Sequence, residues 1–181
     1  SFDGDTGLGE NSLTSRSPFF NLLSWPEMAE LKKAIRFAHD EFINALGLDT
    51  HRKIYVQCWA NVMRKGEVIR RHHHGTNEYG YMGGHISVQV NNTSTYYTNP
   101  YSREETAIPN ARGTLILFPS WIDHRTDMVR DDQERITIAF DMKNEIYTVI
   151  EEETKLTPVL RAGWKIHWTN KKEIFNRVQT S

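Results

Sequence analysis

The sequence predicts a mainly β domain, an antiparallel sandwich or open barrel with an N-terminal helix packed outside. Three observations lead to this prediction. The chain has 181 residues, a length that suits one domain with a sizeable core. One amphipathic helical pattern near the N-terminus is followed by a series of short segments rich in β-branched and aromatic residues. Prolines, glycines and paired aspartates separate these segments, as turns separate antiparallel strands.

We divide this single predicted domain, residues 1–181, into four parts. They are an extended lead-in (1–24), the helix (25–47), a β core (53–143) and a C-terminal extension (144–181). The apolar residues of the helix recur at steps of three and four, which places them on one stripe: Met28, Leu31, Ile35, Ala38, Phe42 and Leu46. We expect His39 and Asp40 to be polar residues on the exposed face of the helix.

The core contains the segments that we predict as strands: 54–63, 83–90, 95–98, 113–118, 126–130 and 135–142. In the C-terminal extension, residues 146–150 form a further candidate strand. Trp164 and Trp168 alternate there with polar residues, so we expect an edge strand with both indoles on one face and His167 in solvent. This pair of tryptophans is a candidate interface for a homo-oligomer.

Composition bears on partners and on location. Lys and Arg total 22 and Asp and Glu total 23, so the formal net charge is -1 and a nucleic-acid partner is not expected. Cys58 is the only cysteine, which excludes an intramolecular disulfide and a cysteine-based zinc cluster. No apolar run reaches the roughly 18 residues of a membrane helix. Residues 1–10 do not resemble a secretory signal, and we expect a cytoplasmic protein with no membrane contact.

Three consecutive histidines are the first candidate for chemistry. On a strand, successive side chains point to opposite faces, so His72 and His74 share a face and His73 points away. Two imidazoles at positions i and i+2 are spaced so that both reach one metal ion. The alternative interpretation is a chance polar turn.

Two later segments add further candidates. A buried strand ends at Pro119, and His124 follows on the turn at its far side. In the next strand, Arg135 and Thr137 share a face, where a guanidinium and a hydroxyl form a natural grip for a carboxylate. Taken alone, such a strand is more often structural.

These segments together, from Trp59 to Asp141, resemble the uncharacterised, mostly microbial and phage branch of the 2-oxoglutarate- and Fe(II)-dependent oxygenases. The motifs of the resemblance are Trp59-Ala60-Asn61, His72-His73-His74, the strand from Gly83 to Val88, the segment from Gly113 to His124, and the strand from Arg135 to Asp141. The most specific part is the pair Phe-Pro-Ser-Trp-x-x-His and Arg-Ile-x-Ile-Ala-Phe.

The resemblance implies a double-stranded β-helix, or jelly-roll, that holds Fe(II) at one mouth. It implies a dioxygenase that couples oxidative decarboxylation of 2-oxoglutarate by O2 to the oxidation, with hydroxylation expected, of a substrate that the motifs leave open. The metal ligands would be His72, His74 and His124. The wider superfamily has an Asp or Glu in place of the second histidine, so the third ligand is either His74 or a carboxylate such as Glu78.

The resemblance also implies a site for the co-substrate. Arg135 would bind the far carboxylate of 2-oxoglutarate, with Thr137 or a tyrosine helping, and Asn61 would make a second contact. His85 would line the pocket or simply pack. Asp141 stands where the family has Asn, and we expect it not to ligate the metal.

Two other functions fit the same residues. One is a cupin-like metalloenzyme with three histidines that uses no 2-oxoglutarate, although Arg135 and Thr137 would then have no role. The other is a non-catalytic jelly-roll binding module, because a fold alone does not decide a function. A spectral response of the metal to 2-oxoglutarate separates the oxygenase from both.

Overall fold

A computed structural model describes residues 12–17, 19–47, 54–74, 82–144 and 179–180. The chain divides into two compact units. The first comprises Ser1–Arg16 and Cys58–Asp141, and the second comprises Ser17–Gln57 and Met142–Ser181. The predicted metal and co-substrate residues all belong to the first unit. The single domain over the whole chain stays a prediction.

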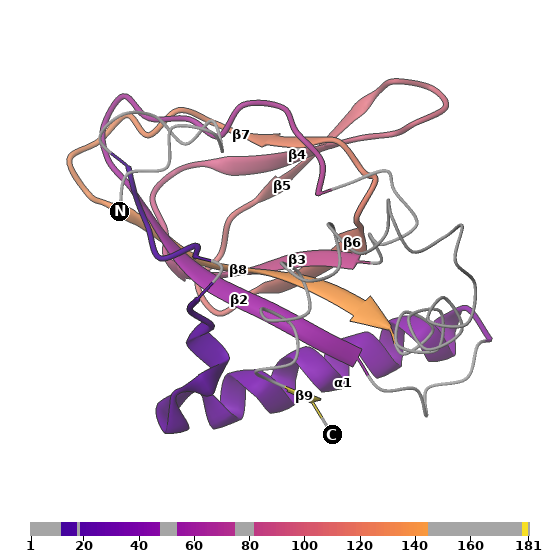
Figure 1. Ribbon diagram of the computed structural model, residues 1–181. Helices are drawn as coiled ribbons and strands as arrows, with labels where there is room; N and C mark the ends of the chain where they lie inside the picture. Colours follow the sequence, from indigo (N-terminus) through magenta and orange to yellow (C-terminus); the bar gives the residue numbers. More distant parts are fainter. Residues whose placement is uncertain (1–11, 18, 48–53, 75–81, 145–178, 181) are drawn as a thin grey trace, which may run out of the picture. The chain divides into compact units, whose positions relative to one another are not determined.

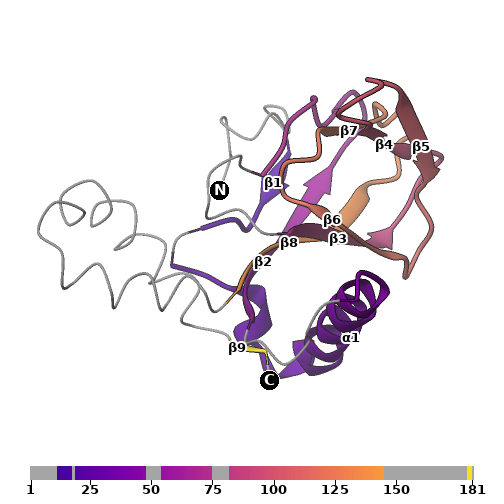
Figure 2. The same ribbon diagram turned by 90° about the vertical axis from the view of Figure 1, so that its right-hand side faces the viewer.

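Two sheets form the first unit, with the strand orders β1-β2-β8-β3-β6 and β5-β4-β7. Figures 1 and 2 show them as two layers, with β4, β5 and β7 in one layer and β2, β3, β6 and β8 in the other. The strands are β1 (Leu13–Thr14), β2 (Ile54–Met63), β3 (Met82–Gln89), β4 (Ser94–Thr98), β5 (Glu105–Pro109), β6 (Leu115–Pro119), β7 (His124–Thr126) and β8 (Arg135–Asn144).

The chain alternates between these layers. After β2 it crosses to the edge of β7, where the Thr126 amide donates to the Ile69 carbonyl at 3.0 Å and His72 forms an antiparallel bridge with His124. It then returns for β3, crosses for β4 and β5, and alternates again through β6, β7 and β8. This path is that of a double-stranded β-helix, so the predicted jelly-roll fold is confirmed.

The interior between the layers mixes apolar and polar side chains. Phe118 is buried, and so are His124, Arg135 and Thr137. Buried polar groups are costly unless they find partners, and their gathering in one interior indicates a site for polar ligands.

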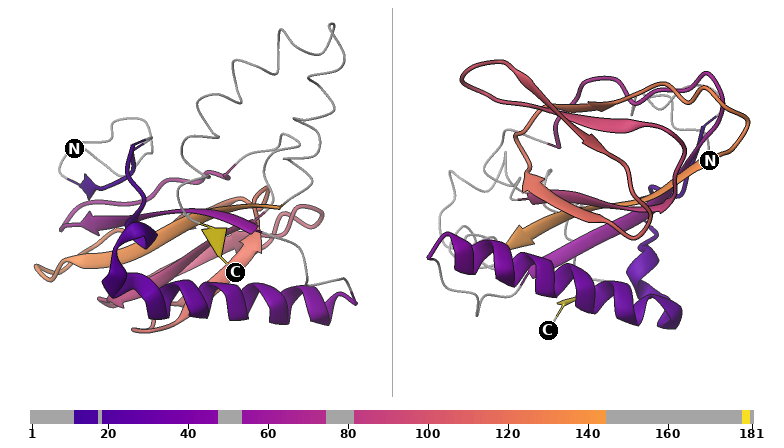
Figure 3. Two further views of the ribbon diagram at one scale, coloured as in Figure 1. Left: turned by 60° about the horizontal axis from the view of Figure 1, so that its bottom comes forward. Right: turned by 180° about the vertical axis from the view of Figure 1, so that it is seen from behind.

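The second unit contains two 3-10 turns, η1 (Leu22–Ser24) and η2 (Pro26–Met28), the helix α1 (Ala29–Ala45) and the short strand β9 (Gln179–Thr180), which pairs with the start of β2. Figure 3 shows α1 as one uninterrupted helix. Gly47 has φ +68°, a conformation that favours glycine and ends the helix where the sequence predicts. The start differs from the prediction, because residues 22–28 form 3-10 turns before α1 begins.

The buried face of α1 differs from the predicted stripe. Its buried residues are Ile35, His39 and Ile43, at steps of four, whereas Leu46 is 58% exposed. Leu46 is the C-cap and therefore lies past the last helical turn. The prediction that His39 is a surface residue is wrong, because its position between Ile35 and Ile43 puts it on the buried face.

The strands of the core follow the prediction with two exceptions. The predicted strand 126–130 is wrong, since β7 ends at Thr126 and the Val129 amide donates instead to the Glu67 carbonyl at 2.9 Å. The strand β5 was not predicted because most of its side chains are exposed and show no buried alternation. The predicted segments 146–150 and 164–168 lie outside the described residues.

Within the described part of the chain, no helix has the length and apolar character needed to cross a membrane.

We predict that Gly84→Ala destabilises the fold by about 1–3 kcal/mol, the usual cost of overpacking a core. A Cβ at this position would overlap the Phe140 ring and lie 2.8 Å from the Ile116 carbonyl oxygen. Urea unfolding measures the effect. In a Phe140→Leu background the added cost of Gly84→Ala should shrink; an unchanged cost would show that the ring is not what Gly84 accommodates.

Candidate metal centre

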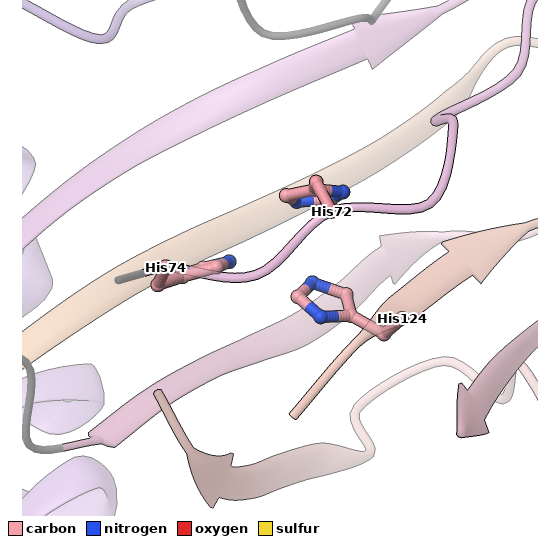
Figure 4. Close-up of side chains that lie close together, drawn as sticks. All are labelled: His72, His74 and His124. Atoms are coloured by element: carbon pink, nitrogen blue, oxygen red, sulfur yellow. The ribbon is translucent and has the colours of Figure 1, made fainter. Parts of the chain in front are cut away.

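Three histidines of the first unit converge on one space. His72, His74 and His124 each offer one ring nitrogen, and these atoms lie within 4.8 Å of one another. Figure 4 shows the three rings around the gap between the 72–74 segment and β7. The bridge brings the first and last together, since the His72 amide donates to the His124 carbonyl at 3.0 Å and the His124 amide returns a bond at 2.9 Å.

Each of these rings is held by its Nδ1 atom. His72 Nδ1 lies 2.8 Å from the Arg70 carbonyl oxygen, and His124 Nδ1 lies 3.1 Å from the Ile122 carbonyl oxygen. A carbonyl only accepts hydrogen bonds, so in both rings Nδ1 bears the proton and donates it.

The third ring follows the same rule with a different acceptor. His74 Nδ1 donates to the carboxylate of Asp141 on β8. A neutral imidazole has one N–H, so a neutral ring anchored through Nδ1 has a bare Nε2, the form in which histidine binds a metal. Fixing the ring through its other nitrogen is what metal-ligating histidines ordinarily need.

Burial keeps two of these rings neutral. It lowers the pKa of His124 to about 2, with the nearby His72 and His74 acting in the same direction. The pKa of His72 is also lowered, mainly by burial. Neutral imidazoles at ordinary pH offer lone pairs instead of positive charge, which suits a divalent cation.

Apolar rings and one glycine surround the cluster. Phe118 lies 4.5 Å from His124 and 5.5 Å edge-on from His74, measured between ring centroids. Gly83, opposite Phe118 in the β3–β6 pairing, leaves room for His74, since a Cβ there would lie 2.9 Å from His74 Nδ1. A glycine at position 83 therefore has a steric reason beside the site.

A second polar group lies next to the histidines. The Tyr97 ring stacks 5.9 Å from His124, and its hydroxyl lies 2.8 Å from His85 Nε2. Arg135 interacts electrostatically with both Tyr97 and His85, and its Nη2 donates to Thr95 Oγ1 at 3.4 Å. Burial lowers the pKa of Arg135 to about 10, so the guanidinium keeps its charge at neutral pH.

Several buried polar atoms of this interior have no hydrogen-bond partner among the described residues. They include Arg135 Nε, His85 Nδ1 and Asn61 Oδ1. A buried cation with a free N–H fits an anionic ligand that supplies the missing acceptor. Asn61 Oδ1 is itself an acceptor, so it faces a carboxylate only if the amide is turned to present its nitrogen.

The structure brings some of the predicted site residues together and separates others. His72, His74 and His124 lie together, whereas His73 is exposed and lies 3.1 Å from the Asp123 carboxylate. Thr137 is buried, but the hydroxyl recorded beside Arg135 is that of Thr95. Glu78, the alternative ligand, lies outside the described residues.

Sequence reasoning missed three participants. Tyr97 was expected only as an unspecified tyrosine, Thr95 was not singled out, and the contact of Asp141 with His74 was not foreseen. Tyr96-Tyr97 in a predicted strand was the available signal for the first of them. Because side chains alternate along a strand, either Tyr96 or Tyr97 could face the interior. The pairing Tyr97↔His124 shows that Tyr97 does.

The fold and the histidine cluster together define a jelly-roll with a candidate metal site between the 72–74 segment and β7. Comparison with known proteins finds a family model that matches part of the chain. Residues 57–141 match the family described as "Putative 2OG-Fe(II) oxygenase", where 2OG denotes 2-oxoglutarate. The resemblance to the 2-oxoglutarate- and Fe(II)-dependent oxygenase superfamily is thereby confirmed. No curated protein matches the chain.

Three solved structures are similar to the chain. A 2OG-Fe(II) oxygenase family oxidoreductase from Burkholderia pseudomallei has 20% identity and TM-score 0.48, covering 56% of this chain and 50% of that one. A Pseudomonas putida prolyl-4-hydroxylase has 12% identity and TM-score 0.51, covering 73% and 67%. The non-heme alpha ketoglutarate dependent epimerase SnoN from nogalamycin biosynthesis has 10% identity and TM-score 0.52, covering 74% and 66%. The chain spans half the length of the Burkholderia protein. The latter two support the fold alone.

We predict that His85 makes the protein sensitive to acid. Burial, with help from Arg135 and His74, lowers the pKa of His85 from 6.5 to about 3. Between these values the unfolded chain binds a proton that the folded chain does not, so stability falls as the pH drops below about 6.5. His85→Gln should remove about 2 kcal/mol of the stability loss between pH 7 and pH 5.

Urea unfolding at the two pH values measures this loss. His73→Gln is the matched control, because His73 is exposed, and it should leave the pH dependence of the wild type unchanged. The same pH dependence in His85→Gln and the wild type would contradict the assignment.

Proposed function

We propose that the protein is an Fe(II)- and 2-oxoglutarate-dependent oxygenase. The observation that supports this best is the convergence of three imidazoles, each anchored through its Nδ1 atom, beside a buried arginine. The family match over residues 57–141 is consistent with the same chemistry. A cytoplasmic location fits this proposal, since Fe(II) persists best in a reducing compartment.

His72, His74 and His124 would hold the iron. Imidazole is a suitable ligand for Fe(II), and three protein ligands leave three positions for a chelating 2-oxo acid and O2. A loaded site supplies the oxidation, in which 2-oxoglutarate and O2 yield succinate and CO2 while one oxygen atom goes to the substrate. The pKa values of His72 and His124 are lowered, so binding the metal displaces no proton from these two rings near neutral pH.

Arg135 would hold the far carboxylate of 2-oxoglutarate. Its guanidinium is buried and charged, and its Nε has no partner among the described residues. The hydroxyls of Thr95 and Tyr97 would be additional donors to this carboxylate. They would take the role that the sequence assigns to Thr137 or a tyrosine. A dry, charged grip of this kind discriminates a dicarboxylate from a monocarboxylate.

The direct test is an anaerobic titration of the protein with Fe(II) and then 2-oxoglutarate, followed in the visible range. We expect a weak charge-transfer band only when both are present, because chelation of the metal by the 2-oxo acid produces it. Metal binding without the band would favour the three-histidine enzyme that uses no 2-oxoglutarate. No metal binding would favour the binding module.

We predict that Arg135→Gln separates the two halves of the site. The variant should bind Fe(II) as the wild type does but bind 2-oxoglutarate about 10- to 100-fold more weakly, the usual worth of a charged hydrogen bond. His124→Ala should lose the metal itself. Arg130→Gln is the matched control, since Arg130 is an exposed cation.

Equilibrium binding of 2-oxoglutarate to the Fe(II)-loaded variants measures these effects, with thermal unfolding to show that Arg135→Gln is folded. Wild-type affinity for 2-oxoglutarate in Arg135→Gln would contradict the proposed role of Arg135 in binding the carboxylate. Wild-type iron occupancy in His124→Ala would contradict the metal ligand set.

A further inference from the structure

We propose that Asp141 is a positioning residue of the metal centre, which aims His74 at the metal and supplies a negative charge that three neutral histidines lack. This inference rests on the proposed metal site and deepens it. Asp141 would act through His74 and would not itself ligate the metal. The resemblance to the family offers no such carboxylate, since the family has Asn at this position.

The contact that supports this proposal joins the 72–74 segment to β8, which lies far away in the sequence. His74 Nδ1 donates to Asp141 Oδ1, and the two residues are 67 positions apart. Both side chains are mostly buried, with exposures of 11% for His74 and 19% for Asp141. A hydrogen bond shielded from water in this way fixes both the ring orientation and the tautomer.

His74 differs in this respect from the other two rings. His72 and His124 donate to the carbonyl oxygens of Arg70 and Ile122, each two residues earlier in the chain. Their anchors are backbone atoms that no substitution removes. The anchor of His74 is a side chain, so the third ligand alone depends on a residue that can be exchanged.

The carboxylate is held on its other side as well. Arg16 Nη2 lies 3.9 Å from Asp141 Oδ2, and the Arg16 guanidinium lies 4.9 Å above the Trp59 ring. The pairing of β1 with β2 positions Arg16, because Thr14 lies opposite Asn61. One oxygen of Asp141 therefore faces His74 while the other faces a cation.

The negative charge of Asp141 matters for the proposed metal site. A carboxylate among the ligands would offset one of the two positive charges of Fe(II), but no His-x-Asp or His-x-Glu sequence follows His72. Asp141 brings a carboxylate one imidazole away from the metal position. A histidine that donates to a carboxylate is a more basic ligand, so His74 would bind the cation more strongly.

Two substitutions separate the charge from the hydrogen bond. Asp141→Asn keeps an oxygen that accepts from His74 Nδ1 but removes the charge, and Asp141→Ala removes both. The chain also offers a matched control pair. His73 Nδ1 lies 3.1 Å from Asp123 Oδ1, the same kind of contact on a ring outside the cluster.

The experiment is a titration of the metal-free, full-length protein with Co(II), with affinity measured by competition against a chelator and by visible absorption. We expect one Co(II) per chain for the wild type. Asp141→Ala should weaken binding 10- to 100-fold, the usual cost of losing such a partner. Asp141→Asn should fall between Asp141→Ala and the wild type, and Asp123→Asn should match the wild type.

A second measurement reads His74 directly and does not need the metal. Nitrogen-15 NMR of the imidazoles in the metal-free protein should show the proton of His74 on Nδ1 in the wild type and in Asp141→Asn. In Asp141→Ala the ring should exchange between tautomers. If Asp141→Ala fails to fold, the comparison of Asp141→Asn with the wild type still tests the proposal. A thermal unfolding temperature equal to that of the wild type shows that Asp141→Asn is folded.

The outcomes distinguish the inference from the function on which it rests. A wild type that binds no Co(II) would overturn the metal site and the inference together. Wild-type affinity in both Asp141 variants would overturn the inference alone. Loss of all binding in Asp141→Asn, with binding retained in His74→Ala, would also overturn it, because Asp141 would then be the ligand.

Discussion

The site depends on one backbone bridge. His72 and His124 exchange two amide hydrogen bonds, and this pairing is the point at which the segment after β2 meets β7. In a hydrogen-bonded antiparallel pair, directly opposed side chains leave the sheet on the same face. The two rings therefore lie 4.3 Å apart between centroids. A slip of one residue would turn one ring away, so the register of two strands decides whether the cluster exists.

The rest of the interior follows from placing neutral imidazoles in a buried space. Burial disfavours the protonation of His72 and His124, and the Nδ1 contacts of these rings leave the Nε2 lone pairs for a ligand. The interior also holds a charged guanidinium, on Arg135, with an unused N–H. Such groups lower the stability of an empty sandwich, and a cation and an anion are the ligands that would compensate them. The jelly-roll thus provides rigid strands on which these groups are held apart.

Much of this architecture could be predicted from the sequence. The strands with continuous β-branched and aromatic residues, such as 54–63 and 135–142, are where the pattern placed them. The spacing of His72 and His74 also predicts a shared face. The exposed strand β5 could not be predicted, because it lacks the alternation that marks a buried face. His39 was missed because its polar side chain suggested the exposed face, although it lies four residues from both Ile35 and Ile43.

The missed parts of the site have a common cause. Tyr97 and Asp141 reach the histidines only through strand pairings between distant segments, and single-sequence periodicity says which face a residue takes but not which neighbour it meets. His124 was predicted from a family resemblance for the same reason. Sequence pattern therefore gives the kinds of residue at the site, whereas the register of the strands gives their partners.

The most direct test of the central claim is anomalous diffraction at the iron edge from crystals of the protein loaded with Fe(II) under anaerobic conditions. We predict a single peak bonded to the Nε2 atoms of His72, His74 and His124, at about 2.1 Å from each, a usual metal–imidazole distance. A peak bonded through an Nδ1 atom, or one that excludes any of the three rings, would contradict the account.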